Sequence, residues 1–403
     1  MRFPKERFRG AALGAALLLF LTACGGGEAD PAPAPAPVVA PDDLSNELLP
    51  EVTLTGATGG QIGDTAPAFT AIANWINSDP LTMEGLRGKV VLIDFWTYTC
   101  VNCIRTFPFL REWQEKYAGQ GLVIVGVHSP EFEFEKLTSN VAMAMEDNGL
   151  GWAVAQDNDF GTWLAYKNRF WPAKYLVDAQ GVVRYTHFGE GAYDETEAQV
   201  RALLTEAGFD VSHIEAGDDP GPQSDPKAIG TSVDDRITRE IYGGFERNAT
   251  QTGIYIAHAR YYDAPEVTQS YTDPGDHLNQ FMYLQGSWFN GLDSIRHART
   301  TESFEDYLAL HFFARSVNGV FELEVGSEPY EVQLTLEDRP LRPDEAGPDV
   351  TIEGGRSFVT VDQARLYEIV SLPSYDDREL KLSSNSPEFA LAAFTFGAYD
   401  GVN

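Results

Sequence analysis

The chain of 403 residues contains only three cysteines, at positions 24, 100 and 103. So few cysteines argue against a fold held together by several disulfides. Cys100 and Cys103 have the Cys-x2-Cys spacing of zinc ligands, but a closed zinc site needs four ligands and the chain has no second cysteine pair. His128 alone would leave such a set incomplete. We therefore expect neither a metal nor another cofactor.

Basic residues are also scarce. Lys and Arg total 29 against 60 Asp and Glu, which gives a formal net charge of −31 at pH 7. This excess of negative charge repels nucleic acids and anionic lipids, so neither is an expected partner. We interpret the acidity as an aid to solubility. The length of the chain leaves room for two domains.

Long apolar runs are missing after residue 21, and the run at residues 11–21 is too short to cross a bilayer comfortably. It follows a basic start and precedes Leu-Thr-Ala-Cys24, so residues 1–24 resemble a bacterial signal peptide with a lipobox. That resemblance implies lipidation of Cys24 and an extracytoplasmic protein anchored to the inner or outer membrane. A cleaved signal with a chance cysteine, or an uncleaved anchor, are the alternatives.

Residues 25–50 have no apolar periodicity, and Pro alternates with Ala at positions 31–37. Such a segment favours extended polyproline geometry. We expect it to act as a semi-rigid tether between the membrane and the folded part.

The chemistry-bearing stretch is residues 90–108, VVLIDFWTYTCVNCIRTFP. Residues 90–95 predict a buried strand, and a helix is expected to begin near Cys100. A thiolate is favoured at a helix N-terminus, so we expect Cys100 to be the exposed nucleophile and Cys103 the resolving thiol. This pattern favours redox exchange over zinc binding.

The same stretch resembles the thioredoxin family, which places an acid, a tryptophan and a helix proline at the offsets of Asp94, Trp96 and Pro108. Trp171-Pro172 resembles the cis-proline loop of that fold. FWTYTCVNC and VGVHSPEFEFEK are similar to the C-terminal region of DipZ proteins, which are TlpA/ResA-like thiol–disulfide oxidoreductases.

This resemblance implies roles for residues around the dithiol. Asp94 would move the proton of Cys103, Trp96 would shield the disulfide, and Trp171 with Pro172 would bind the substrate chain. For Asp94 the alternative is a solvated carboxylate at a strand end. The dipeptide is Val-Asn where many thioredoxins have Gly-Pro, and this dipeptide tunes the reduction potential, so the direction of electron flow stays open.

Residues 51–212 predict a thioredoxin-like α/β domain. Strands are expected at residues 90–95, 121–127, 175–178 and 182–186, and a helix at residues 134–145. Asp194 and Glu197 predict a capping box at the start of a last helix. Strand, helix and strand followed by a hairpin and a helix make an α/β sandwich.

A polar, Pro/Gly-rich linker is expected at residues 213–230, followed by a second domain at residues 231–403. Residues 321–325 and 330–337 alternate apolar and polar side chains, and short runs follow at residues 358–361, 366–370, 379–382 and 389–396. This period of two predicts an antiparallel β-sandwich. In the DipZ family this position holds a jelly-roll domain that resembles carbohydrate-binding modules.

Three functions compete. Thiol–disulfide exchange with cysteine-containing client proteins is favoured, and the resemblance implies a separate membrane electron donor of the CcdA/DsbD type. A peroxidase is less favoured: Thr97 and Cys100 have the T-x-x-C spacing, but Ile93 replaces that motif's proline. A glycan- or partner-binding lipoprotein would use aromatic residues, although these are more often core. The aromatic residues in question are Tyr261, Tyr262, Tyr271, Phe281, Tyr283, Trp288 and Phe289.

Overall fold

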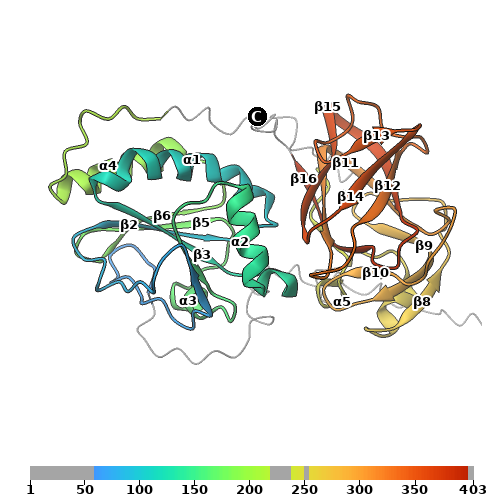
Figure 1. Ribbon diagram of the computed structural model, residues 1–403, viewed down its shortest axis with the longest axis horizontal. Coiled ribbons are helices and arrows are strands. Elements are labelled where there is room, and N and C mark those ends of the chain that lie inside the picture. Colours follow the sequence, from blue (N-terminus) through green and yellow to red (C-terminus); the bar gives the residue numbers. More distant parts are fainter. Residues whose placement is uncertain (1–58, 218–236, 249–253, 398–403) are drawn as a thin grey trace, which may run out of the picture. The chain divides into compact units, whose positions relative to one another are not determined.

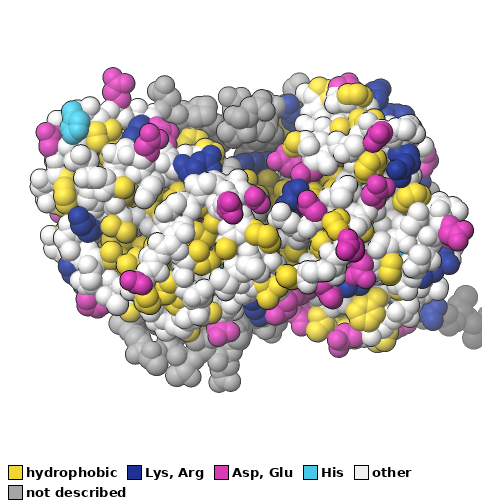
Figure 2. Space-filling view, in the orientation of Figure 1, with side chains coloured by type: hydrophobic (Ala, Val, Ile, Leu, Met, Phe, Trp, Pro, Cys, Tyr) yellow, Lys and Arg dark blue, Asp and Glu magenta, His cyan; other side chains and the backbone are white. Residues whose placement is uncertain are grey.

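The computed structural model describes residues 59–217, 237–248 and 254–397. The predicted signal peptide, Cys24, the Pro/Ala-rich tether and most of the predicted linker lie outside these residues. Within them, no helix is both long enough and apolar enough to cross a membrane. Acidic side chains are spread over the face shown in Figure 2, with Lys and Arg side chains among them.

The N-terminal half contains a six-stranded sheet in the order β1-β4-β3-β2-β5-β6. β2 is parallel to β3 and β3 to β4, whereas β1, β5 and β6 run antiparallel to their neighbours. The strands are β1 Asn74–Ile76, β2 Val90–Trp96, β3 Leu122–His128, β4 Ala153–Gln156, β5 Ala173–Val177 and β6 Val183–Phe188. Every residue of β2 is buried, which confirms the predicted buried strand.

Helices cover both faces of this sheet (Figure 1). Residues of α1, α2 and α4 share one hydrophobic cluster with alternate residues of β2, and residues of α3 share another cluster with the remaining ones. The helices are α1 Val101–Tyr117, α2 Thr138–Asp147, α3 Gly161–Ala165 and α4 Tyr193–Glu206, with short 3-10 turns η2 Ala118–Gln120 and η3 Glu133–Lys136. The expected thioredoxin-like α/β architecture is confirmed.

Alternation along β2 decides which side chains face the cysteines. Val90, Leu92 and Trp96 belong to the cluster that contains Cys103, whereas Ile93 and Phe95 belong to the other cluster. Side chains alternate between the two faces of a strand, so Asp94 lies on the cysteine side. The side of the sheet on which this carboxyl lies thus follows from the alternation of side chains along β2.

Two local predictions in this half were wrong. The helix expected from residue 134 begins at Thr138, after the 3-10 turn η3. The predicted capping box does not form: α4 begins after Ala192, a left-handed residue (φ 49°), with no side-chain cap. Asp194 lies in the first turn of α4, and Glu197 is buried and accepts a hydrogen bond from the Tyr117 hydroxyl at 2.5 Å. Glu197 therefore joins α4 to α1.

At residues 237–248 and 254–397, the regular structure is all β apart from the short turns α5 Phe245–Asn248 and η5 Ala259–Asp263. Its strands pair antiparallel in one ten-stranded hydrogen-bonded sheet. They are β7 Ile241–Tyr242, β8 Thr268–Tyr271, β9 Met282–Asn290, β10 Ile295–His297, β11 Tyr307–Glu322, β12 Tyr330–Leu336, β13 Thr351–Glu353, β14 Arg356–Val361, β15 Arg365–Ser383 and β16 Ala390–Gly397. The predicted all-β antiparallel class is confirmed.

The long strands β11 and β15 connect most of this sheet, because each pairs with different strands along its length. The first part of β11 pairs with β9 and its second part with β16, while β15 follows it throughout. The β11–β15 register jumps between Ala314 and Ser316, where β15 carries extra residues that include Pro373. Bulges tolerate proline and bend a strand. The two segments expected at residues 366–370 and 379–382 are therefore parts of a single strand.

Candidate active site

The two cysteines lie at the start of α1. Cys100 is the N-cap residue, and its Sγ accepts a hydrogen bond from the Cys103 N–H at 3.3 Å. The first N–H groups of a helix lack partners within the helix, so negative charge is favoured there. Cys100 is partly exposed and Cys103 is fully buried. One sulfur can therefore meet another molecule while the second lies behind it.

The surroundings of Cys103 favour its neutral thiol. Burial raises the pKa of Cys103 well above its usual range, and the neighbouring Cys100 sulfur adds to this shift. The backbone N–H of Thr97 acts in the opposite direction, because it donates to the Cys103 sulfur. Cys103 must therefore lose its proton to a base before it can act as a nucleophile.

Asp94 is the carboxyl group on the cysteine side of β2. It is 1% exposed, and its Oδ1 has no hydrogen-bond partner in the described part of the chain. Burial raises the pKa of Asp94 to about 7, although positive charge on Lys174 acts to lower it. The alternative of a solvated strand-end carboxylate is therefore wrong. A carboxyl group that titrates near neutral pH can both accept and return a proton.

Lys174 is a site residue that the sequence analysis missed. It is fully buried on β5, pairs in register with Asp94, and its Nζ has no hydrogen-bond partner among the described residues. Burial lowers the pKa of Lys174, while Asp94 and Cys103 act to raise it. The alternation of side chains along the strand could have revealed this residue. Ala173 and Tyr175, on either side of Lys174, belong to the cluster on the face away from Cys103, so Lys174 points to the face with Cys103.

The three predicted substrate-binding residues differ in exposure. Trp96 is buried, with its ring edge-on to Phe107 at 5.4 Å between centroids. Trp171 is partly exposed and donates from Nε1 to the Ser129 carbonyl at 3.1 Å. The Trp171–Pro172 bond is cis, and the buried Pro172 uses its carbonyl to accept from Gly189 N–H at 2.8 Å. Of the three, only Trp171 presents a side chain to solvent.

A second buried carboxyl group, also missed from sequence, holds the loop before Cys100. Glu135 Oε1 accepts from the Thr99 hydroxyl at 2.6 Å and from Thr99 N–H at 3.3 Å. Its Oε2 accepts from the N–H groups of Glu131 and Phe132. Glu135 thereby ties the residue preceding Cys100 to the loop that follows β3.

His128 is the last residue of β3 and is completely buried. Its ring stacks on Tyr98 at 5.7 Å between centroids, and burial lowers the pKa of His128 to about 3. Its Nε2 lies 3.5 Å from the Thr97 Oγ1. The Thr97 hydroxyl therefore lies against the buried His128 ring. Among the described residues, no three His, Cys, Asp or Glu side chains gather as they would around a metal ion.

The first turn of α1 also contacts the C-terminal half, within the same compact unit of the chain. Val101 and Ile104 pack in a hydrophobic cluster with Leu366 and Ala393. Val101 is a residue of the dipeptide between the cysteines. Val101 and Ile104 are thus partly buried against this cluster.

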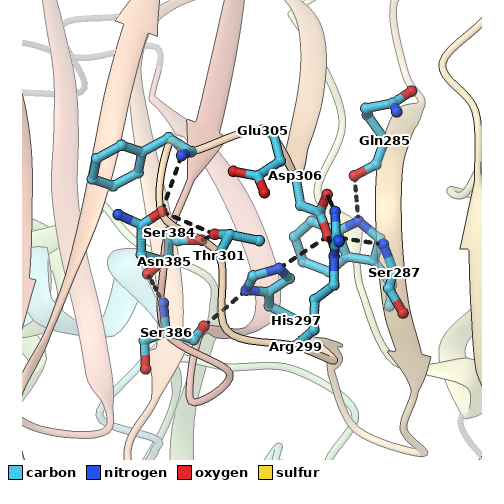
Figure 3. Close-up of polar contacts among 12 residues, drawn as sticks. Gln285, Ser287, His297, Arg299, Thr301, Glu305, Asp306, Ser384, Asn385 and Ser386 are labelled. Carbon is cyan, nitrogen blue, oxygen red and sulfur yellow. Dashed lines mark hydrogen bonds and ion pairs between the residues drawn. The ribbon is translucent and has the colours of Figure 1, made fainter.

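The C-terminal half has a buried polar cluster of its own around Asp306 (Figure 3). Arg299 donates to this carboxylate from Nε at 2.7 Å, His297 Nε2 lies 3.2 Å from it, and Ser287 N–H donates at 3.0 Å. Burial acts to raise the pKa of Asp306, but these hydrogen bonds prevail and hold it at about 2. A Cβ on Gly286 would lie 2.0 Å from the Asp306 Cγ, so this contact requires glycine. Because the donors converge on one carboxylate, the cluster holds together the segments that carry them.

Most of the aromatic residues considered for glycan stacking belong to the core. Tyr261 and Trp288 are fully buried, and Tyr271 and Tyr283 are 5% exposed. Tyr262, Phe281 and Phe289 are partly exposed. The expectation that such residues are core is confirmed for the buried four.

Comparison with known proteins agrees with this geometry. Residues 62–186 match the AhpC/TSA family, and residues 238–397 match the family described as thioredoxin-like C-terminal domain. Protein DipZ of Mycobacterium bovis is 37% identical over 258 residues, which cover 63% of this chain and 34% of DipZ. The chain thus spans about a third of the length of that relative.

Two shorter relatives match the N-terminal half. The thiol–disulfide oxidoreductase YkuV of Bacillus subtilis is 29% identical over 36% of this chain and 94% of its own length. The thiol–disulfide oxidoreductase ResA of Bacillus thuringiensis is 25% identical over 36% of this chain and 79% of its own length. The resemblance to DipZ and to ResA-like thiol–disulfide oxidoreductases is confirmed.

Proposed function

We propose that this relative of DipZ, YkuV and ResA is an extracytoplasmic, lipid-anchored enzyme that exchanges disulfides with client proteins through Cys100 and Cys103. The observation that carries the proposal is the contrast between the cysteines. Cys100 is partly exposed at a helix N-terminus, whereas Cys103 is buried on the face of the sheet that also carries Asp94, a carboxyl group that titrates near neutral pH.

In the first step, the Cys100 thiolate attacks one sulfur of a client disulfide. An S–S bond forms between Cys100 and the client, the client's own S–S bond breaks, and one client thiolate leaves. Negative charge on the Cys100 sulfur is favoured by the Cys103 N–H that points at it. The partly exposed Trp171, next to the cis Pro172, would offer an apolar surface to the client chain.

In the second step, Cys103 resolves the mixed disulfide. The Asp94 carboxylate accepts the Cys103 proton, the resulting thiolate attacks the Cys100 sulfur, and the second client thiolate leaves. Cys100 and Cys103 are then joined by a disulfide. Run backwards, the same steps oxidise a client dithiol, with Asp94 returning the proton.

The proposal includes partners and a location. Turnover as a reductase needs electrons from elsewhere, for which we propose a separate membrane protein of the CcdA/DsbD type. The lipid anchor at Cys24 rests on the Leu-Thr-Ala-Cys motif after a basic and apolar leader. A polyproline-like tether at residues 25–50 would hold the enzyme away from the membrane surface.

Trapping of clients tests the assignment of the two cysteines. Cys103→Ser should accumulate mixed disulfides with client proteins, because Cys100 can attack and nothing displaces the client. Cys100→Ser should trap few, because Cys103 is buried. The measurement is a non-reducing gel of each variant expressed in the native compartment. Equal trapping by both variants would contradict the assignment.

A further inference from the structure

The turn at residues 97–99, between β2 and α1, contacts both cysteines through its backbone. The Thr97 N–H donates to the Cys103 sulfur. The Thr97 carbonyl accepts from the Cys100 N–H at 3.4 Å, where α1 begins. All three side chains of the turn are buried. A displacement of this turn would therefore change the surroundings of the resolving sulfur.

Glu135 of η3 fastens this turn with one of its two carboxylate oxygens. Its Oε1 accepts from the Thr99 hydroxyl at 2.6 Å and from the Thr99 N–H at 3.3 Å. The Thr97 hydroxyl also forms a hydrogen bond that favours the carboxylate form of Glu135. The first and the last residue of the turn are thus both bonded to this one buried group.

The second oxygen of Glu135 fixes the carboxylate to its own loop. Oε2 accepts from the Phe132 N–H at 3.0 Å and from the Glu131 N–H. One oxygen therefore faces donors of the turn, and the other faces donors of the loop after β3. A carboxylate accepts on both oxygens, whereas a neutral amide has only one oxygen and presents N–H groups on its other side. The arrangement thus requires a carboxylate at this position.

We propose that Glu135 is a positioning residue for the resolving step, because it holds the turn at residues 97–99 so that the Thr97 N–H stays on the Cys103 sulfur. When Cys103 loses its proton, this N–H donates to a full negative charge, and such a hydrogen bond favours the thiolate. The inference rests on the proposed function, because Cys103 must become the thiolate that displaces the client from Cys100.

Glu135→Gln tests the need for the carboxylate. Whichever way the amide turns, either the turn or the loop loses its acceptor. Once the Thr97 N–H moves off the sulfur, the Cys103 thiolate is harder to form. Resolution should then slow by about tenfold at pH 7, and its pH profile should move by about one unit to higher pH. The attack by Cys100 should change little, because the N–H that points at its sulfur belongs to α1.

Thr99→Val and Thr99→Ser form a matched pair at the shortest of these hydrogen bonds. Valine has nearly the shape of threonine but lacks the hydroxyl that donates at 2.6 Å. Resolution should slow as in Glu135→Gln, but by less, because the Thr99 N–H still donates to Glu135. Serine keeps the hydroxyl and should restore the wild-type profile. This pair decides the inference even where Glu135→Gln impairs folding.

The assay uses the reduced full-length chain with Cys24→Ser, which removes the third thiol, and the aromatic disulfide of thionitrobenzoate. The first thionitrobenzoate is released when Cys100 attacks. The second is released when Cys103 resolves the mixed disulfide, so the second phase reports resolution alone. Both phases are followed from pH 5 to pH 9. Glu115→Gln removes one exposed acid of α1 and, as the control for net charge, should give the wild-type profile.

Other ionisable groups near the site do not differ between these variants. The titratable groups that face Cys103 or Glu135 are Cys100, Asp94, Lys174, Glu131 and Tyr98. All five are present in every variant. A shift of the profile in one variant therefore comes from the substituted side chain and from the turn that it holds.

The outcomes separate this inference from the proposed function. If the parent chain releases only one thionitrobenzoate, dithiol exchange itself fails. If it releases two, a slower second phase with a shifted pH profile in Glu135→Gln and Thr99→Val supports the inference. A second phase that is unchanged in both variants overturns only the inference. Equal slowing of both phases also overturns it, because Glu135 would then act on the whole dithiol turn and not on resolution.

Discussion

Replacing Asp94 by asparagine should stabilise the reduced protein, and increasingly so as the pH rises. Asp94 is 1% exposed and its Oδ1 has no hydrogen-bond partner among the described residues, so its ionised form is poorly solvated. Asparagine has nearly the same shape and cannot ionise. The variant should lose the proposed base of the resolving step and gain free energy of unfolding.

The magnitude follows from the pKa of Asp94, which burial raises from 3.8 to about 7. Between these two pH values the native state binds more protons than the unfolded state, so the free energy of unfolding falls as the pH rises. Each unit of pKa difference is worth about 1.4 kcal/mol. The carboxyl therefore costs about 2 kcal/mol at pH 5 and about 4 kcal/mol at pH 8.

Urea denaturation of wild type and Asp94→Asn at pH 5 and pH 8 measures this difference. Six of the seven tryptophans precede residue 172, so tryptophan fluorescence reports mainly on the half of the chain that contains Asp94. The advantage of the variant should grow by about 2 kcal/mol between the two pH values. Burial also raises the pKa of Glu135 and of Asp157 to about 7, but both proteins contain these groups and their contribution cancels.

The control is Glu115→Gln, which removes an exposed carboxyl group from α1. Its difference from the wild type should be near zero and the same at both pH values. A constant difference between Asp94→Asn and wild type across this range would refute the argument, because it would mean that Asp94 titrates alike in the folded and unfolded states.

Two further substitutions have clear expected results. Glu135→Gln should destabilise the protein by about 1–3 kcal/mol in the same urea assay, in contrast to Asp94→Asn, because an amide NH₂ would face N–H groups that now donate to a carboxylate oxygen. Stability equal to wild type would show that these donors do not need the carboxylate. Cys24→Ser should move the protein from the membrane fraction to the soluble fraction and abolish labelling with a fatty-acid analogue. Unchanged labelling would exclude Cys24 as the lipid-bearing residue.

The sequence predicted the part of the site that is local in the chain. Asp94, Cys100 and Cys103 lie within ten residues. The alternation of side chains along β2 and the start of α1 at Cys100 are enough to place them around the turn between the strand and the helix. The cis bond before Pro172 matches the fold that the resemblance implied. In these cases the local spacing and the family pattern pointed to the same arrangement.

The residues that the sequence analysis missed are brought to the site by strand pairing. Lys174 reaches Asp94 only because β5 pairs antiparallel with β2 in one particular register. A shift of one residue would turn Lys174 to the opposite face. Glu135 reaches Thr99 from the 3-10 turn η3. The sequence analysis predicted a helix at this position because the neighbouring apolar residues have helical spacing. Register and short turns depend on contacts that a single sequence does not display.

In the C-terminal half, period-two patterns predicted strands but not their continuity. Pro373 suggests a break between two strands, because proline cannot donate to a ladder. It lies instead in the segment where β15 carries extra residues, so one strand of 19 residues continues past it. Polar residues or a proline interrupt the alternating pattern both at a turn between two strands and at a bulge within one strand, so the sequence alone does not distinguish the two.

Two buried aspartates differ in whether they could exchange protons near neutral pH. Asp306 and Asp94 are 2% and 1% exposed, but their surroundings differ. Asp306 accepts hydrogen bonds from Arg299, Ser287 and His297, so its charge is satisfied and its pKa is held at about 2. The Oδ1 of Asp94 has no partner within the described residues, and burial raises the pKa of Asp94 to about 7. A satisfied carboxylate stabilises a fold but cannot exchange protons near neutral pH, whereas an unsatisfied one lowers stability and can do so. The buried carboxyl that costs stability is on the same side of β2 as Cys103, for which the proposed resolving step would need a base.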